Sequence, residues 1–338
     1  MVPPPPGESM RKLGVAVIGV GYWGRNHVRV LSEFPRAKLL AVCDTDEVRA
    51  REVAEAYGVP YFTDPADLLR REDVEAVTIC TWSTVLAQVA KMALTAGKHV
   101  LVEKPMAASS REALELVRLA EEEGLTLAVG FIERFNPGVN FIRELISRGE
   151  LGEVVALSSR RLSRWPRRAG DVGVLKDLAI HDVDLSRYLL GEEPEAVYAR
   201  VGRLKRQDLD DYAFLMLSFP GGRVASIEAN WLSPYKKREL MVTGSEAVAT
   251  LNYLTQEVAI EREDGIFRPA RRWIEPLRLE LEHFVDCVLN NRQPLVSGLD
   301  GLVALRLCEL ALESSSKGEA IRVGDLLSPY SSRPSRRP

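Results

Sequence analysis

Between residues 13 and 130 the chain alternates short apolar runs with helical stretches, and this alternation constrains the fold more than any other feature of the sequence. Runs such as Val15–Ile18 and Val77–Cys80 suit buried parallel strands, which are apolar on both faces. The pattern predicts strands at Leu13–Val20, Leu39–Asp44, Tyr61–Phe62, Ala76–Thr81, His99–Val102 and Thr126–Val129. It predicts helices at Val48–Tyr57, Thr84–Ala96 and Arg111–Glu123. We therefore expect a doubly wound parallel sheet with crossover helices.

After about residue 150 the rhythm changes to consecutive strands separated by turns. Pro220-Gly221-Gly222 is the clearest hairpin signal among these turns. The expected strands are Val154–Leu162, Ala196–Leu204, Tyr212–Phe219, Arg223–Trp231, Arg238–Thr243, Ala247–Asn252 and Glu257–Arg262. The expected helices are Leu175–Leu190, Glu275–Asn290 and Leu299–Lys317. This order predicts an α+β domain with a large, mostly antiparallel open sheet.

The length of 338 residues suits two domains, which we place at residues 1–133 and 134–327, with a flexible tail at 328–338. The hydrophobic share of 46% and charged share of 28% are those of a soluble globular protein. A net charge of −3 provides no basic surface for nucleic acid, and no apolar run reaches the roughly 18 residues of a membrane span. The four cysteines form no C-x-x-C pair, so neither a disulfide framework nor a zinc site is expected. These features predict a cytoplasmic protein with neither a membrane nor a nucleic acid as partner.

Residues 19–24 read G-x-G-x-x-G, directly after the first expected strand and before a helical stretch. In this setting Gly19 permits a tight turn, Gly21 lets a pyrophosphate approach the backbone, and Gly24 lets helix and strand pack closely. The phosphates would lie on the free amides at the start of the helix. We therefore expect Gly19, Gly21, Tyr22, Trp23 and Gly24 to bind a dinucleotide.

Asp44 ends the second expected strand, 20 residues beyond Gly24, where a carboxylate accepts hydrogen bonds from the adenosine ribose. A negative charge there repels a 2′-phosphate, so the sequence predicts NAD rather than NADP. The alternative is a glycine-rich turn followed by a surface aspartate. The agreement of strand, loop, helix and acidic residue disfavours that alternative.

Glu103-Lys104-Pro105 ends the fifth expected strand, at the carboxyl edge where open α/β sheets bind ligands. A lysine there could orient or protonate a substrate oxygen, although a lysine at a strand end is usually solvated.

Asp177, His181 and Asp184 follow the i, i+4, i+7 spacing and are expected to share one helix face. An aspartate one turn from a histidine can fix its tautomer and prepare the imidazole as a general base. The alternative is a solvated acidic face. No metal is expected, because no third ligand with a recognisable spacing accompanies the pair.

An arginine cluster precedes this helix, with Trp165 inside it. Guanidinium groups bind diphosphate or carboxylate, and an indole can stack on a sugar or base, so the cluster would suit a nucleotide sugar. A solvated, arginine-rich loop is the alternative. The arginines are Arg160, Arg161, Arg164, Arg167 and Arg168.

The chain resembles the glucose–fructose oxidoreductase, inositol dehydrogenase and rhizopine-catabolism (Gfo/Idh/MocA) family over residues 11–325. The resemblance rests on four ordered motifs: the loop at 19–24, Glu103-Lys104-Pro105, GFIERFNP at 130–137, and Asp177-x-x-x-His181-x-x-Asp184. It implies a Rossmann domain and a catalytic group of Lys104, Asp177 and His181. His181 would take a proton from a sugar hydroxyl as NAD accepts a hydride, and Lys104, from the other domain, would polarise the same oxygen. The outer face of the second sheet would build a homodimer or homotetramer.

We place further residues at the cofactor and at the substrate. The cofactor contacts are Thr81, Trp82, Glu103 and Lys104, and the substrate contacts are Arg134, Asn136, Arg161 and Trp165.

Residues 21–27 and 171–182 are most similar to UDP-N-acetylglucosamine 3-dehydrogenases, which implies oxidation of the 3-hydroxyl of a nucleotide sugar. One departure concerns Trp82 and Leu86, which replace a proline and a histidine that many relatives carry beside the nicotinamide. Free-sugar or inositol oxidation is a second hypothesis, preferred if the arginine cluster lies far from the pocket. A non-catalytic, dinucleotide-sensing protein is a third hypothesis.

Overall fold

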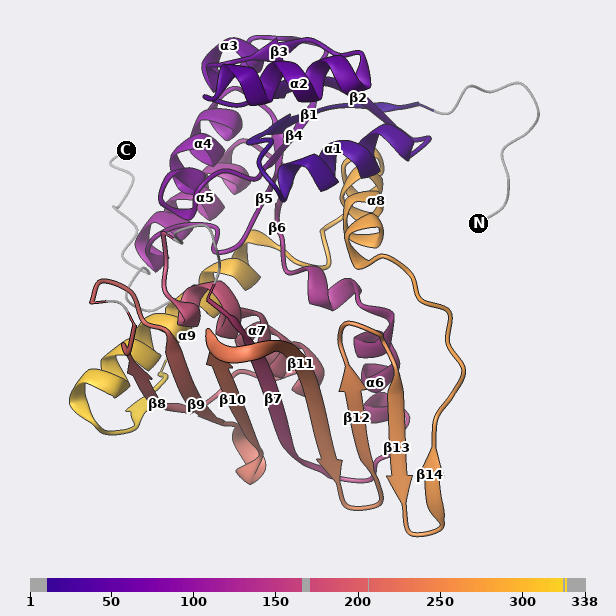
Figure 1. Cartoon of the computed structure of the whole chain (residues 1–338), viewed down its shortest axis with the longest axis vertical. Coiled ribbons are helices and arrows are strands. Elements are labelled where there is room, and N and C mark those ends of the chain that lie inside the picture. The colour runs from indigo at the N-terminus through magenta and orange to yellow at the C-terminus, as the bar shows by residue number, and fades with distance from the viewer. Residues whose placement is uncertain (1–10, 166–170, 206, 325, 327–338) are drawn as a thin grey trace, which may run out of the picture. The chain divides into compact units, whose positions relative to one another are not determined.

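The computed structural model describes residues 11–165, 171–205, 207–324 and 326, which form two compact units (Figure 1). Unit 1 comprises the chain up to Glu103 together with Leu116–Gly130 and Leu277–Ser297. Unit 2 comprises Lys104–Glu115, Phe131–Pro276 and the chain from Gly298 onwards. The units therefore interleave along the sequence, whereas we had placed a single boundary at residue 133. The expected tail at 328–338 lies outside the described residues.

Unit 1 is built on a six-stranded sheet in the order β3-β2-β1-β4-β5-β6, with every neighbouring pair parallel. This is the strand order of a Rossmann domain, so the predicted doubly wound sheet is confirmed. All residues of β1 are buried, as expected for a central parallel strand. The strands are β1 (Leu13–Ile18), β2 (Ala37–Cys43), β3 (Tyr61–Phe62), β4 (Ala76–Ile79), β5 (His99–Val102) and β6 (Leu127–Val129).

The helices of unit 1 begin and end at residues that suit these positions. The side chain of Asp46 accepts a hydrogen bond from Arg49 N at the start of α2, and Gly58 ends that helix at φ 64°. The unit contains α1 (Gly24–Glu33), α2 (Glu47–Tyr57), α3 (Pro65–Leu69), α4 (Ser83–Thr95) and nearly all of α8 (Pro276–Leu289). Helix α5 (Ser110–Glu122) contributes residues to both units.

Unit 2 contains a nine-stranded sheet in the order β14-β13-β12-β11-β7-β10-β9-β8-β15. The β7–β10 pair is parallel and the others are antiparallel, which confirms the predicted open sheet. Its strands are β7 (Val154–Arg164), β8 (Ala196–Gly202), β9 (Tyr212–Ser218), β10 (Val224–Asn230), β11 (Leu232–Gly244), β12 (Val248–Asn252), β13 (Val258–Arg262), β14 (Gly265–Phe267) and β15 (Ile321–Arg322). The elements that were not predicted are the helices α3 and α6 and the short strands β14 and β15.

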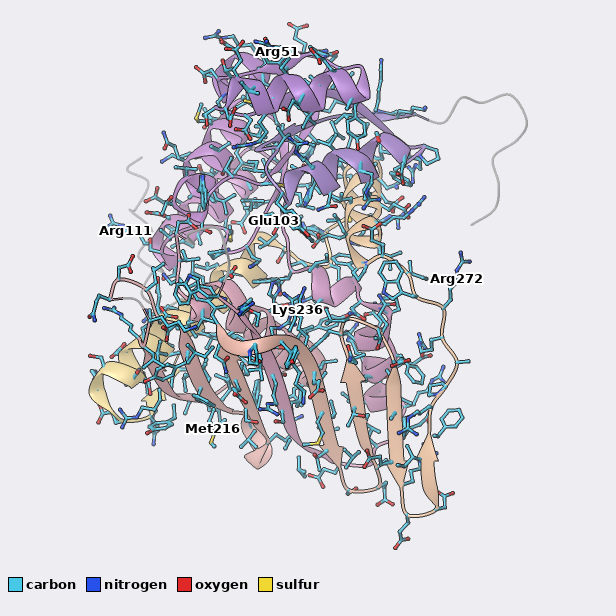
Figure 2. The ribbon with its side chains drawn as sticks, in the orientation of Figure 1. Arg51, Glu103, Arg111, Met216, Lys236 and Arg272 are labelled. Carbon is cyan, nitrogen blue, oxygen red and sulfur yellow. The ribbon has the colours of Figure 1, made fainter. Side chains whose placement is uncertain are left out.

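Helices α6 (Pro137–Ser147), α7 (Ile180–Leu190) and α9 (Gly298–Lys317) pack on one face of this sheet (Figure 1). Side chains that point toward these helices, such as Leu157, Ser159 and Arg161 of β7, are buried. The other face carries exposed apolar side chains, among them Phe214 and Met216. Met216 is labelled in Figure 2. The sheet therefore has one face in the core of unit 2 and one face open to solvent.

Candidate active site

The loop at residues 19–24 joins β1 to α1 in unit 1, and its glycines meet different constraints. A Cβ on Gly24 would lie 1.8 Å from the carbonyl oxygen of Gly19, so only glycine fits there. Gly19 has φ 85°, and a Cβ there would lie 2.7 Å from the backbone of Cys80. A Cβ on Gly21 would meet nothing within 4 Å. Gly24 and Gly19 therefore shape the loop, while the space beside Gly21 is open to a pyrophosphate.

This contrast predicts different defects in two matched variants. Gly21→Ala should fold with an unchanged melting temperature but bind NAD at least about 10-fold more weakly, because the added methyl group occupies the phosphate approach. Gly24→Ala should instead lower the melting temperature, because its Cβ overlaps the backbone. Calorimetric NAD titration and thermal melts measure the two effects. Equal NAD binding by Gly21→Ala and the unaltered chain would contradict this interpretation.

The Asp44 carboxylate is fixed at the end of β2 and is 7% exposed. Its Oδ2 accepts a hydrogen bond from Val20 N at 2.9 Å. Its Oδ1 accepts hydrogen bonds from Asp46 N at 3.0 Å and from Arg49 at 3.0 Å. The carboxylate is therefore held against the loop, at the position where Rossmann domains bind ribose hydroxyls.

Asp44→Asn should bind NAD about 10- to 100-fold more weakly, because a charged acceptor for the ribose is lost. The same change leaves Arg49 without one of its anionic partners, so the preference for NAD over NADP should shrink. Binding of both dinucleotides is measured by titration calorimetry, with Glu47→Gln as the control on exposed α2 surface. An undiminished preference for NAD in Asp44→Asn would refute the assignment.

Glu103 connects the loop to the end of β5 within unit 1. Its Oε1 accepts a hydrogen bond from Trp23 Nε1 at 2.7 Å and lies 3.2 Å from Nε2 of His27. A Cβ on Gly130 would lie 2.8 Å from the Glu103 carboxylate, so this glycine makes room for it. Glu103 therefore positions Trp23, while Tyr22 in the same loop is 81% exposed. We had not singled out His27, whose side chain is completely buried beside Glu103.

Two departures from the family pattern lie at the start of α4. Trp82 precedes the helix and is 54% exposed, and Thr81 lies directly before it. Leu86 is buried in the core of unit 1, so it is a packing residue and not a cofactor contact. Trp82 and Thr81 stay predicted cofactor contacts.

Lys104 and Asp177 meet within unit 2. The Lys104 ammonium donates to the backbone carbonyl of Asp177 at 2.6 Å and to its Oδ1 at 2.9 Å. Both side chains are partly exposed, at 15% and 29%. We had placed Lys104 in the first domain, but residues 104–115 belong to the same compact unit as His181.

A π-helical turn at Leu175–Ala179 carries Asp177 and leads into α7. Single π turns within helices are frequent at functional sites, and the side-chain pattern does not reveal them. We had expected Asp177 to fix the tautomer of His181. Instead, Asp177 binds Lys104, and Nδ1 of His181 is buried without a hydrogen-bond partner in the described part of the chain.

His181 is 6% exposed, and the ring of Phe131 lies edge-on with its centroid 6.0 Å away. Burial lowers the pKa of His181 well below its usual value, and the positive charges of Lys104, Arg161 and Arg238 lower this pKa further. At neutral pH the imidazole is therefore uncharged and able to accept a proton.

Two family models match the chain. One, described as "Oxidoreductase family, NAD-binding Rossmann fold", matches residues 13–131, and the other, the GFO/IDH/MocA C-terminal domain, matches residues 139–250. The inositol 2-dehydrogenase of Rhizobium meliloti (strain 1021) is 31% identical over 326 residues, covering 91% of this chain and 98% of that protein. The chain belongs to the GFO/IDH/MocA family of oxidoreductases. The predicted family membership is thereby confirmed.

Two further relatives bear on cofactor and substrate. The UDP-N-acetylglucosamine 3-dehydrogenase of Acidithiobacillus ferrooxidans is 30% identical, covering 86% of this chain and 94% of that protein. The structure of GenD2 from gentamicin A biosynthesis in complex with NAD is 26% identical, with a TM-score of 0.84, covering 95% of this chain and 99% of that one. The cofactor of this oxidoreductase is NAD, as predicted. Nucleotide-sugar and inositol dehydrogenases are about equally similar to it.

Three of the four predicted substrate contacts of this oxidoreductase form ion pairs or hydrogen bonds within unit 2. Arg134 makes a bidentate ion pair with Asp184. Asp184 is therefore bound to Arg134 and does not form a group with Asp177 and His181. Asn136 is 1% exposed and starts α6 by accepting a hydrogen bond from Gly138 N. Arg161 is 0% exposed and pairs with two carboxylates, Glu133 at 2.9 Å and Asp182. Their side chains are buried and make hydrogen bonds or ion pairs within unit 2, and all three stay predicted substrate contacts.

The fourth predicted contact, Trp165, packs edge-on against Trp231 with ring centroids 4.8 Å apart. The arginine cluster around it is not a single site. Arg160 lies on the open face of the sheet and pairs with Glu228 at 2.8 Å, while Arg161 points into the core. Arg164 is exposed, and Arg167 and Arg168 lie outside the described residues.

None of the described helices is both long and apolar enough to cross a membrane.

Proposed function

We propose that this oxidoreductase transfers a hydride from a hydroxyl-bearing carbon of a sugar or cyclitol to NAD, with Lys104, Asp177 and His181 as the catalytic group. The observation that carries the proposal is the pairing of Lys104 with Asp177 in the unit that also holds the uncharged His181. An ammonium that can donate a hydrogen bond and an imidazole that can accept a proton are the two groups that oxidation of a hydroxyl requires.

When bound, NAD accepts the hydride at its nicotinamide ring. His181 takes the hydroxyl proton as the carbon is oxidised to a ketone. Lys104 donates a hydrogen bond to the same oxygen, and Asp177 positions Lys104 through the contacts at 2.6 and 2.9 Å. The open space beside Gly21 and the fixed Asp44 carboxylate suit the pyrophosphate and the ribose of the dinucleotide.

The low pKa of His181 predicts where the pH–rate profile falls. Protonation removes the base, and because burial and the charges of Lys104, Arg161 and Arg238 oppose protonation, the pH must fall below 6.5 before activity is lost. The pH dependence of kcat/KM measures this acid limb in the free enzyme. A limb at or above pH 6.5 would count against His181 as the base.

Our first candidate substrate is UDP-N-acetylglucosamine, oxidised at its 3-hydroxyl. The similarity of residues 21–27 and 171–182 to the 3-dehydrogenases of this nucleotide sugar supports it, as does the Acidithiobacillus relative at 30% identity.

The second candidate is a free sugar or an inositol. The placement of Arg160 on the open sheet face and of Arg161 in the core favours it, because neither guanidinium is offered to a diphosphate. The Rhizobium relative, an inositol 2-dehydrogenase, adds support.

A substrate panel tests the proposal. NAD is mixed with UDP-N-acetylglucosamine, free hexoses or inositols, and the absorbance of reduced nicotinamide is followed. We expect turnover on at least one class, with UDP-N-acetylglucosamine ranked first. Tight NAD binding without turnover on any of them would instead favour a dinucleotide-sensing protein.

We also propose that the chain assembles as a homodimer or homotetramer through the open face of the unit 2 sheet. Tyr198, Phe214, Met216 and Met241 expose between 38% and 49% of their surface on this face. Light scattering on the intact chain, compared with a Phe214→Glu and Met216→Glu double variant, tests this proposal. A monomeric intact chain would refute it.

A further inference from the structure

Strands β7 and β11 place two arginines side by side on the face that packs against the helices. Arg238 is the direct cross-strand partner of Arg161. Like charges in this arrangement repel each other, so such a pair needs compensation. Arg161 has it, since Glu133 and Asp182 both bind its guanidinium.

The positive charge of Arg238 is balanced by nearby carboxylates much less than that of Arg161. Its guanidinium lies 3.8 Å from Oε1 of Glu133, which is longer than a hydrogen bond, and its side chain is 27% exposed. Lys236, two residues earlier on the curved first part of β11, is exposed (Figure 2). Within residues 11–165, 171–205, 207–324 and 326, neither the guanidinium of Arg238 nor the ammonium of Lys236 makes a hydrogen bond. The two side chains thus have donors to spare, out of the five N–H groups of an arginine and the three of a lysine.

These two cations act on each other, and Arg238 also acts on the proposed catalytic group. The positive charge of Arg238 is the largest cause that lowers the pKa of Lys236. Arg238 also contributes to the lowered pKa of His181, and the charge of Asp177 acts on Arg238. Asp182, which binds the neighbouring Arg161, directly follows His181 in α7. Arg238 therefore lies within electrostatic range of His181 and Asp177, and Lys236 lies within range of Arg238.

We propose that Lys236 and Arg238 form a subsite for an anionic group, a carboxylate or a phosphate, carried by the sugar that is oxidised. The inference rests on the proposed function and names the substrate class. The oxygen atoms of an anion would accept the spare N–H donors and offset the repulsion between Arg238 and its cationic neighbours. A neutral sugar would offer these donors no negative charge.

Binding of three small probes to the NADH complex tests the subsite. D-glucuronate supplies a carboxylate, D-glucose 6-phosphate supplies a phosphate, and D-glucose is the neutral reference; each is titrated calorimetrically. At least one charged probe should bind about 10- to 100-fold more tightly than glucose, the effect of a hydrogen-bonded charge. The charged probe with the larger gain in affinity over glucose identifies the anionic group.

Lys236→Gln and Arg238→Gln should each abolish most of this advantage. Lys237→Gln is the matched control, because Lys237 lies between them but pairs with Glu239 at 2.9 Å on the opposite face. If Arg238→Gln proves unstable, the exposed Lys236→Gln decides alone.

Equal affinity for charged and neutral probes, including no binding of any probe, would overturn the subsite, as would an advantage that survives Lys236→Gln. Turnover that is insensitive to charge would reject the subsite and leave the proposed function intact. Charge-dependent binding without turnover on any sugar would support the subsite and reject the proposed function.

Discussion

Replacing His181 with asparagine is expected to lower turnover by about 10²- to 10⁴-fold, the usual contribution of a general base. The imidazole is buried and uncharged, so it is suited to accept the proton. NAD binding should be unchanged, because the dinucleotide loop belongs to unit 1. Steady-state kinetics on the best substrate of the panel measures the first effect, and titration calorimetry measures the second.

His99→Asn is the matched control for this experiment. His99 is also partly buried, and burial lowers its pKa too, but its Nδ1 accepts a hydrogen bond from Thr126 N within unit 1. Its replacement should lower the free energy of unfolding but should not lower turnover as the replacement of His181 does. If His181→Asn retained more than a tenth of the normal turnover, His181 would not be the base.

The largest effect on stability is expected from Arg161→Met. This change removes the cation that binds Asp182 and Glu133 and leaves both carboxylates buried with too little positive charge. Breaking a buried ion pair from one side costs about 3–5 kcal/mol of unfolding free energy. Urea unfolding followed by circular dichroism measures the loss.

The neighbouring Arg160 provides the control on the same strand. It lies on the open face of the sheet, is 45% exposed and pairs with Glu228, so Arg160→Met should cost no more than about 1 kcal/mol. Equal unfolding midpoints for the two variants would show that the buried pair does not stabilise unit 2.

The elements that the sequence predicted well carry local signals. The strand-loop-helix order around Gly19–Gly24 and the carboxylate at position 44 are read from spacing alone, and the structure places both at one end of the parallel sheet. Alternation along β7 also held a signal that we did not use. Adjacent residues of a strand face opposite sides, so Arg160 and Arg161 could not have served one site.

The remaining features depend on contacts between distant parts of the chain. The pairing of Arg134 with Asp184 joins residues 50 positions apart, and that of Lys104 with Asp177 joins residues 73 positions apart. A single sequence does not tell which aspartate meets which cation. The π turn that carries Asp177 is invisible for another reason, because its residues have the same apolar spacing as an ordinary helix.

The origin of the hydride tests the central claim most directly. UDP-N-acetylglucosamine carrying deuterium at C3 is incubated with the protein and NAD, and the recovered reduced cofactor is analysed by mass spectrometry and NMR. We expect one deuterium at C4 of the nicotinamide, and we expect His181→Asn to form almost none of this deuterated cofactor. Reduced cofactor without deuterium, or with as much of it formed by His181→Asn, would contradict the account.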